Sequence, residues 1–502
     1  MTDRVGTVAV VGRDAPLWLA AAALQRAFGV TGVRVQAVEL PSWLGSVDCY
    51  STLPSLASMH RLLGIDEAKI LEAASGVPVV AQRFSNWAKG APPYLVAYDD
   101  DPSGSGDLPF AQYWLKGHKE GLRAGIEDFS LGCACARLGR VPLPPATANA
   151  ELSASYGYNL DASIYAEALK QLAARRGVET ISARIADVKV EGERISSIEL
   201  EGGATVKADL FVDASGAERV LMMRLPGAQF HSWPDRFPCD RVLTASAAKF
   251  RSLPAFAQIS AIRGGWIGIH PLRDRTTISA VYSSDTISDQ AMVAQLAVLA
   301  RMPVSGDAVV SDLRPGLLDR PWVGNCVAIG EAAAAVDPLA AVGLHLAQGC
   351  ISHLVTLFPA TAGQMPESMA YNDTIRAFAS NIADFTQAHY LLNRRFDDPF
   401  WDQAREAPAT PTLRSKIDLF SARGAVSLRD NETFSEQSWT WLFLGAGIEP
   451  EGFDPRIDLV ADRPLIEKVQ QRLRTVAELA KRMPSVDQFV GGIDQLEAAG
   501  VT

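Results

Sequence analysis

The sequence has few cysteines, no long basic stretch and no long apolar run, and each absence excludes a class of protein. Its 502 residues include six cysteines without repeated C-x-x-C pairs, so neither a disulfide framework nor a zinc knuckle is expected. Acidic residues outnumber basic residues by 57 to 47, whereas a protein that follows a phosphate backbone carries a basic surface. We therefore expect reduced thiols, no metal site and no nucleic-acid partner.

No segment has the length of a membrane anchor or the composition of a secretory signal. The longest alanine-rich run, Leu17–Leu24, is much shorter than the about 20 residues that cross a bilayer. Charged Asp3 and Arg4 follow Met1 closely, without the basic region, apolar stretch and cleavage site of a signal peptide. We expect a protein of the cytoplasm that does not bind membranes.

The chain does have enough apolar residues, 48%, for a large core and two or three domain-sized units. An apolar run at residues 6–12 ends in glycine, helix-forming residues follow at 17–28, and a second apolar run covers 33–39. This succession predicts the βαβ unit that opens a dinucleotide-binding domain. Glu39 stands where such folds hydrogen-bond a ribose.

Later segments extend this α/β pattern. Residues 161–177 predict an amphipathic helix, short strands are expected around Val188 and Ile198, and buried strands at 208–216 and 326–330. The hydrophilic stretch Asp99–Asp107 predicts a surface loop, because it has too few apolar residues to bury. We predict a flavoprotein-type module over residues 1–350, with inserted substrate-side segments, and a mainly helical, substrate-covering region over 351–502.

A series of short strings resembles the flavin-dependent tryptophan halogenase family over nearly the whole chain. They are the N-terminal strand and helix with Trp18, Leu53–Leu56, Arg83–Trp87, Tyr113–Leu115, Asn159–Ala162, Asp209–Asp213, Gly265–Trp266, Asp337–Leu339 with Gly343, Gln387–Tyr390, and Pro399–Trp401. Each string is short, and their order and spacing carry the resemblance. It implies an α/β fold: an FAD-binding Rossmann-like module with mixed sheets, plus a mainly helical C-terminal region.

The resemblance also implies a reaction and its site. In that family, reduced FAD, oxygen and chloride or bromide produce hypohalous acid, which a lysine and a glutamate direct onto tryptophan or a similar indole. A separate flavin reductase supplies the reduced FAD, and a homodimer is one expected assembly. Cofactor contacts are implied for Gly12, Arg13, Ala15, Glu39, Asp213, Gly330, Asp337 and Gly343, and a substrate pocket for Trp266, Phe434 and Trp439.

The residues that would direct the halogen differ from the family pattern. Val79 stands at the lysine position and Ala340 at the glutamate position, so neither provides a charge or a proton-transfer group. Lys89, His270 and His345 are candidate substitutes. Each also has a structural interpretation: Lys89 as a solvated loop residue, His270 as a hydrogen-bonded histidine and His345 as a residue of a helix. Backbone amides near Gly343 could still hold the halide.

The cofactor motifs differ as well. The family's G-x-G-x-x-G reads GRDAPL at residues 12–17, which retains one glycine and places Asp14 near the expected diphosphate. Tyr50 replaces a glutamate of a flavin-contacting segment, and the family's W-x-W-x-I-P reads WIGIHP at 266–271. These changes predict weakened FAD binding. Two hypotheses remain: a divergent FAD-dependent halogenase or monooxygenase, and a pseudoenzyme that binds a ligand or a partner.

Overall fold

The computed structural model describes residues 4–100, 108–143 and 152–492. Contacts between residues divide the chain into two compact units, each built from three segments. Unit 1 comprises Met1–Ala74, Leu160–Pro234 and Leu313–Ala383, and unit 2 comprises Ser75–Asn159, Asp235–Asp312 and Asp384–Thr502. Because the segments alternate along the chain, the units do not coincide with the predicted regions 1–350 and 351–502.

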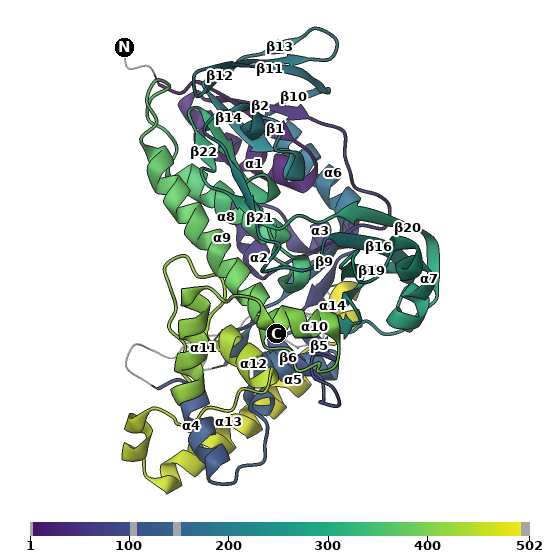
Figure 1. The fold of residues 1–502 in the computed structure, drawn as a ribbon, viewed down its shortest axis with the longest axis vertical. Helices are drawn as coiled ribbons and strands as arrows, with labels where there is room; N and C mark the ends of the chain where they lie inside the picture. The colour runs from purple at the N-terminus through teal and green to yellow at the C-terminus, as the bar shows by residue number, and fades with distance from the viewer. Residues whose placement is uncertain (1–3, 101–107, 144–151, 493–502) are drawn as a thin grey trace. The chain divides into compact units, whose positions relative to one another are not determined.

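A six-stranded sheet forms the centre of unit 1. Its order is β10 (Glu179–Ser182), β2 (Arg34–Glu39), β1 (Thr7–Gly12), β14 (Leu210–Ala214), β23 (Cys326–Ala328) and β22 (Trp322–Val323). All neighbours are parallel except β22 and β23. Helix α1 (Asp14–Phe28) follows β1 and packs against α6 (Ala162–Arg175) and α8 (Gly343–Thr356) (Figure 1). The carboxyl ends of the parallel strands form the edge where such sheets bind dinucleotides.

Gly12 ends β1 at this edge, between Glu39 of β2 and Ala214 of β14. A Cβ atom on Gly12 would lie 2.3 Å from the carbonyl oxygen of Ala214. Glycine is therefore required because the two strands approach closely, not because the backbone is strained. The first glycine of the predicted βαβ turn thus has a packing role.

Smaller elements complete unit 1. The strands expected around Val188 and Ile198 form an antiparallel sheet of β11 (Ile185–Glu191), β12 (Arg194–Leu200) and β13 (Thr205–Val206). A second small sheet contains β15 (Phe230–Ser232), β21 (Gly316–Leu318) and β24 (Ala334–Ala335). Short strand β3 (Cys49–Ser51) precedes α2 (Ser55–Leu62) and α3 (Glu67–Ala73), and α9 (Glu367–Leu391) begins in this unit.

Unit 2 contains a seven-stranded, mainly antiparallel sheet. Its order is β20 (Val304–Asp312), β16 (Arg241–Ala248), β19 (Arg275–Tyr282), β18 (Gly265–Pro271), β17 (Phe256–Ile262), β5 (Ala81–Ser85) and β6 (Tyr94–Ala97). One face packs its apolar residues on Met292 and Leu296 of α7 (Asp289–Ala300), which lies beside β16, β19 and β20 in Figure 1. The opposite face carries Trp266, Gly268 and His270, since side chains alternate along a strand.

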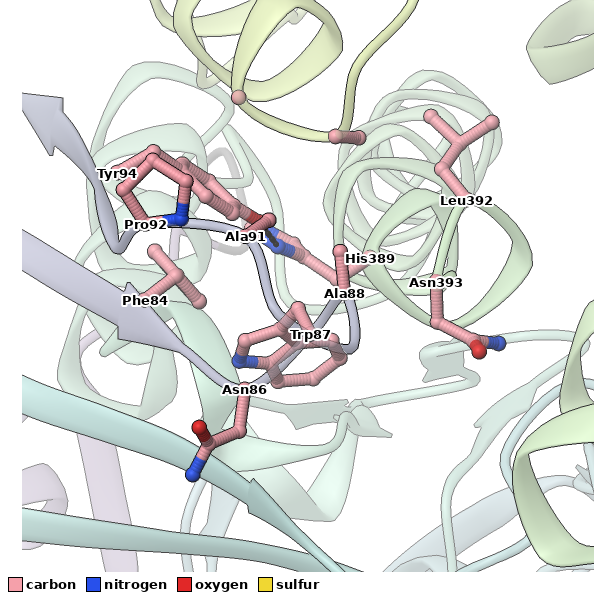
Figure 2. Close-up of a pocket in the computed structure, with 12 residues that line it drawn as sticks. Phe84, Asn86, Trp87, Ala88, Ala91, Pro92, Tyr94, His389, Leu392 and Asn393 are labelled. Atoms are coloured by element: carbon pink, nitrogen blue, oxygen red, sulfur yellow. Dashed lines mark hydrogen bonds between the residues drawn. The ribbon is translucent and has the colours of Figure 1, made fainter. Parts of the chain in front are cut away.

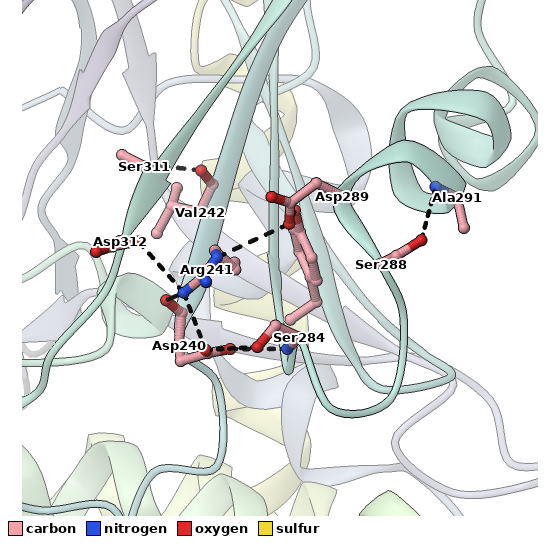
Figure 3. A network of polar contacts seen from close by, with 10 residues as sticks. Asp240, Arg241, Val242, Ser284, Ser288, Asp289, Ala291, Ser311 and Asp312 are labelled. Atoms are coloured by element: carbon pink, nitrogen blue, oxygen red, sulfur yellow. Dashed lines mark hydrogen bonds and ion pairs between the residues drawn. The ribbon is translucent and has the colours of Figure 1, made fainter.

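Ion pairs join the α7 end of this sheet. The guanidinium of Arg241 lies 2.9 Å from Asp240, 3.3 Å from Asp312 and 3.8 Å from Asp289 (Figure 3). Asp240 also accepts hydrogen bonds from the backbone and side chain of Ser284. The network connects β16, β20 and the start of α7, and its partly exposed groups form a structural link, not a ligand site.

The remaining helices of unit 2 come mostly from the C-terminal segment. They are α4 (Phe110–Lys119), α5 (Leu131–Leu138), α10 (Pro399–Glu406), α11 (Pro411–Arg423), α12 (Glu436–Gly445), α13 (Asp462–Arg482) and α14 (Val486–Gly491). No strand lies among the described residues after 350. The predicted α/β fold with mixed sheets and a mainly helical C-terminal region is therefore confirmed.

Two local predictions need correction. Helix α1 begins at Asp14, before the predicted Leu17, because Pro16 fits the first turn of a helix. Asp99 belongs to strand β7 (Asp99–Asp100), not to a surface loop, and its carboxylate accepts a hydrogen bond from the backbone of Gly132 at 2.7 Å. The rest of the predicted loop, residues 101–107, lies outside the described residues.

Candidate functional site

Arg13 follows β1 in unit 1 but is held by neighbouring protein groups. Its guanidinium donates to the carbonyl of Ser215 at 2.9 Å, pairs with Glu218 at 2.7 Å and stacks on the Trp43 ring at 3.6 Å. The residue is 7% exposed. Its charge is therefore already paired with Glu218, which limits what it can offer to a phosphate.

Glu39 ends β2, at the position expected to bind a ribose. Its carboxylate oxygens each lie 2.8 Å from the ammonium of Lys170 on α6, and one accepts from the hydroxyl of Ser182 at 2.5 Å. A carboxylate has about four lone-pair positions. Glu39 can therefore accept a further bond from a ribose hydroxyl at this strand end.

Asp213 and Asp337 are fully buried and have structural contacts. Asp213 accepts hydrogen bonds from the backbone of Leu221 and Met222 and from the backbone and hydroxyl of Ser215. Asp337 caps the short 3-10 helix Pro338–Ala340 by accepting from the backbone of Leu339 at 3.0 Å. These contacts leave Asp213 little capacity for a ligand, and they make both carboxylates organisers of the turns around them.

The start of α1, where a dinucleotide diphosphate would lie, does not fit that group. Asp14 has φ of +59°, a conformation that favours glycine. Its carboxylate accepts from the hydroxyl of Ser42 at 2.5 Å, and burial raises its pKa. A partly buried carboxylate repels an anion placed beside it. Gly12 and Glu39 suit a dinucleotide, but the diphosphate position does not suit FAD.

The second family segment of unit 1 surrounds Ala340. Ala340 is 1% exposed and presents only a methyl group, and the next residue, Ala341, has φ of +58°. Gly343 begins α8, and a Cβ atom there would meet nothing within 4 Å. A backbone turn at a helix start beside open space has the geometry that accepts small anions. Ala340, which the sequence predicts to stand at the family's glutamate position, provides no carboxylate here.

His345 lies in the first turn of α8. Its Nδ1 is 2.7 Å from the hydroxyl of Ser55, which also lies 3.2 Å from Gln348, and its ring packs edge-on against Phe378. Burial lowers the pKa of His345 to about 4, so the ring is neutral at pH 7. A neutral, hydrogen-bonded imidazole cannot take the place of an ammonium.

Val79 ends strand β4 (Val77–Val79) in unit 2 and pairs with Gly157. It is 1% exposed, so the position that the sequence predicts for the family's lysine is a buried apolar site. Lys89 lies exposed in the turn after β5, where its backbone donates to the carbonyl of Arg394. An exposed lysine keeps its ammonium in water. Lys89 therefore does not supply a charge within a dry site.

On β18, two other side chains occupy the space that the second tryptophan of the family motif is expected to fill. Trp266 is buried and donates from Nε1 to the hydroxyl of Tyr390 at 3.0 Å. Gly268 stands at the second tryptophan position, and the space beside it holds His270 and Ser279, whose side chains are 3.0 Å apart. Burial lowers the pKa of His270 to about 4. His270 is therefore uncharged and packs where the family pattern has an indole.

Gly268→Ala tests this packing. The added Cβ would lie 2.6 Å from Nε2 of His270 and 2.7 Å from Oγ of Ser279, so we expect the free energy of unfolding to fall by about 1–3 kcal/mol. Chemical denaturation would measure the loss, and His270→Ala in the same chain should recover most of it. Gly343→Ala, where the Cβ meets open space, is the matched control. Equal losses at both glycines would contradict this packing.

Phe434 and Trp439 lie in unit 2 within the aromatic packing of the C-terminal helices. Phe434 stacks on Phe385 with 3.6 Å between ring centroids, and Trp439 meets Phe385 edge-on at 4.9 Å. Trp439 also donates from Nε1 to Glu432 at 3.3 Å and is 0% exposed. Neither ring therefore offers a free face for a substrate in this structure.

A small pocket in unit 2 lies where two of the family strings meet. Phe84 and Trp87 come from one string and His389 from another, and Tyr94 of β6 completes the aromatic wall (Figure 2). The rings of Phe84 and His389 stack at 4.4 Å, and those of Phe84 and Tyr94 at 5.2 Å. The pocket was not predicted from the sequence. Aromatic residues within the strings were its only signal, and no spacing rule connects residues 84 and 389.

The cysteines are six separate thiols, five of them buried. All six cysteines are free thiols, and burial raises the pKa of Cys135 to about 12 and also raises that of Cys133. No group of three or more His, Cys, Asp or Glu residues in the described part of the chain could hold a metal ion. Within the same residues, no helix combines the length and apolar character needed to cross a membrane.

Comparisons with known proteins agree with the fold. A family model described as tryptophan halogenase matches residues 7–462. The tryptophan 7-halogenase KtzQ of Kutzneria sp. (strain 744) is 26% identical over 98% of this chain and 99% of its own length. The solved structure of BrvH, a flavin-dependent halogenase from Brevundimonas sp. BAL3, has a TM-score of 0.91 and 29% identity, covering 98% of this chain and 99% of that one. Xcc4156, a flavin-dependent halogenase from Xanthomonas campestris, has a TM-score of 0.90 and 29% identity over 97% and 98% of the two chains.

Proposed function

Because the chain belongs to the tryptophan halogenase family, we propose that it is a halogenase-like protein that has lost the family's directed halogenation and now binds a ligand or a partner. The family role is halogenation of tryptophan or a similar indole with reduced FAD, oxygen and halide. In this chain, FAD binding is weak or absent. The protein acts in the cytoplasm, either as a monomer or as a homodimer.

The apolar pair Val79 and Ala340 carries this proposal. An electrophilic halogen needs an ammonium to hold it, and the ring intermediate needs a carboxylate that stabilises its charge or accepts its proton. Both positions are 1% exposed and have no polar side-chain atom. A nearby polar group would have to replace both functions in a dry environment.

The three candidate substitutes do not meet this requirement. Lys89 is exposed to water. His270 and His345 are neutral and already hydrogen-bonded to Ser279 and Ser55, respectively. Their contacts support the structural interpretation of both histidines.

A divergent FAD-dependent halogenase or monooxygenase is the second candidate. The observation in its favour is the open backbone turn at Gly343, which has room for chloride or bromide. This candidate would use a separate flavin reductase and a small aromatic substrate such as an indole. It requires side chains other than Val79 and Ala340 to direct the chemistry.

A halogenation assay separates the two candidates. Purified protein would receive FAD, a flavin reductase, NADH, oxygen and bromide with tryptophan, indole and a panel of phenols, and products would be detected by mass spectrometry. We expect brominated product at least about 100-fold below that of KtzQ, the positive control, because the directing acid–base groups are missing. Enzyme-dependent bromination at one ring position, at a rate near that of KtzQ, would establish the second candidate instead.

A further inference from the structure

Tyr50 covers the start of α1, where the helix offers its unpaired backbone N–H groups. Its hydroxyl interacts with the backbone N–H of Ala15, within the first turn of the helix. Its ring meets Tyr165 edge-on, with centroids 6.2 Å apart. A dinucleotide diphosphate needs these same N–H groups. The tyrosine therefore lies beside a donor that the diphosphate would use.

Asp14 connects a second segment to the same helix start. Its carboxylate accepts a hydrogen bond from the hydroxyl of Ser42 at 2.5 Å. Trp43 lies under the guanidinium of Arg13, at 3.6 Å. The Asp14 carboxylate and the Ser42 hydroxyl that donates to it therefore lie beside the first turn of α1.

The charges around this position are unfavourable for another anion. Asp48 interacts electrostatically with both Asp14 and Tyr50, and Glu331 with Tyr50. Burial raises the pKa of Asp14 and of Glu331. Arg13 pairs with Glu218, and Arg219 donates to the carbonyl oxygens of Ala217 and Glu331. These arginine contacts leave the acidic groups at the helix start only partly compensated.

We propose that Tyr50 and Asp14 close the diphosphate site of unit 1, so that the chain excludes FAD although the surrounding nucleotide-binding edge is retained. This inference rests on the weak FAD binding of the proposed function and assigns its cause to two side chains. Gly12 still permits the close strand approach, and Glu39 still ends β2. Opening the site should therefore need few changes.

Titration with FAD tests the proposal. The proteins are the unaltered chain, Asp14→Gly, Tyr50→Gly and the double variant, followed by flavin absorbance and fluorescence. We expect the double variant to bind FAD at least about 100-fold more tightly than the unaltered chain, because an anion and a steric obstacle are both removed. Riboflavin, which lacks the diphosphate, should bind all four proteins alike. Asp373→Asn, an exposed change on α9, is the control and should leave FAD affinity unchanged.

Three results would overturn the proposal. They are tight FAD binding by the unaltered chain, an equal gain for riboflavin and FAD, and a folded double variant whose FAD affinity does not rise. If the glycine variants unfold, Asp14→Asn and Tyr50→Phe preserve side-chain volume and should still give a measurable gain. Tight FAD binding by the unaltered chain would overturn the weak FAD binding of the proposed function as well, whereas the other two results would overturn only the assignment of its cause to Asp14 and Tyr50. The bromination assay tests the loss of directed halogenation separately.

Discussion

Acidification is expected to unfold this protein steeply between about pH 6.5 and about pH 4. Burial lowers the pKa of His60, His270 and His345 from 6.5 to about 4, and that of His389 to about 3. The unfolded chain therefore binds more protons than the folded chain as the pH falls through this window. The stability associated with these neutral rings is fully present above pH 6.5 and is lost below it.

The effect is large because four rings act together, of which His60 and His389 are buried and His270 and His345 are partly buried. Each shift corresponds to a loss on the order of 3 kcal/mol once the window is crossed, and the total stability of a domain is about 5–15 kcal/mol. Asp14, Glu331 and Asp384 oppose the loss, since burial raises their pKa values and their protonation favours the folded chain as the pH falls. These carboxyl groups moderate the slope without reversing it.

Denaturant titrations at successive pH values would measure this slope. His60→Gln removes one titrating ring and should flatten the curve by up to one proton. His231→Gln, at an exposed position, should leave the slope unchanged. An unfolding free energy that stays constant from pH 6.5 to pH 4 would show that these rings are not held neutral by burial.

Lys416→Met is expected to lower the free energy of unfolding by about 3–5 kcal/mol, because it leaves Glu432 as a buried, unpaired charge. The ammonium of Lys416 lies 2.6 Å from Glu432, and the two side chains are 2% and 5% exposed. Lys416 also donates to the carbonyl of Ser427 at 3.0 Å and lies 4.9 Å from the centre of the Trp439 ring. Water cannot replace these contacts without opening the aromatic packing of the C-terminal helices.

A double replacement separates the effect of the unpaired buried charge from the effect of changed side-chain packing. Lys416→Met combined with Glu432→Leu removes both charges and should be much less destabilising than Lys416→Met alone, since no buried charge remains. Glu467→Gln removes an ion pair with Arg463 whose side chains are 90% and 63% exposed, and should cost less than about 0.5 kcal/mol. Equal losses for the single and double replacements would mean that side-chain packing, not charge, decides the effect.

The aromatic pocket and the contacts of Asp14 and Tyr50 at the start of α1 could be found only in the tertiary structure, because both bring together residues that are distant in the chain. Trp266 meets Tyr390 through a hydrogen bond of 3.0 Å, and Trp87 packs on Trp401 at 4.9 Å, yet nothing in the local pattern of either segment requires these pairs. Tyr50 stands at a family glutamate position, but its contact with Ala15 depends on how the segment folds onto α1. Side-chain direction follows from the packing of several segments at once.

Local patterns were sufficient for a different set of conclusions. Apolar periodicity and helix-forming residues predicted β1, α1 and β2, because secondary structure depends largely on neighbours within a few residues. The order of the family strings indicated the fold, and Val79 and Ala340 were assigned from the sequence to the family's lysine and glutamate positions, which stays a prediction. Burial, hydrogen-bond partners and pKa values could be known only from the tertiary structure. His270 fills the space beside Gly268, and Asp14 and Tyr50 lie together at the start of α1. These properties depend on three-dimensional neighbours, which the linear order of residues does not specify.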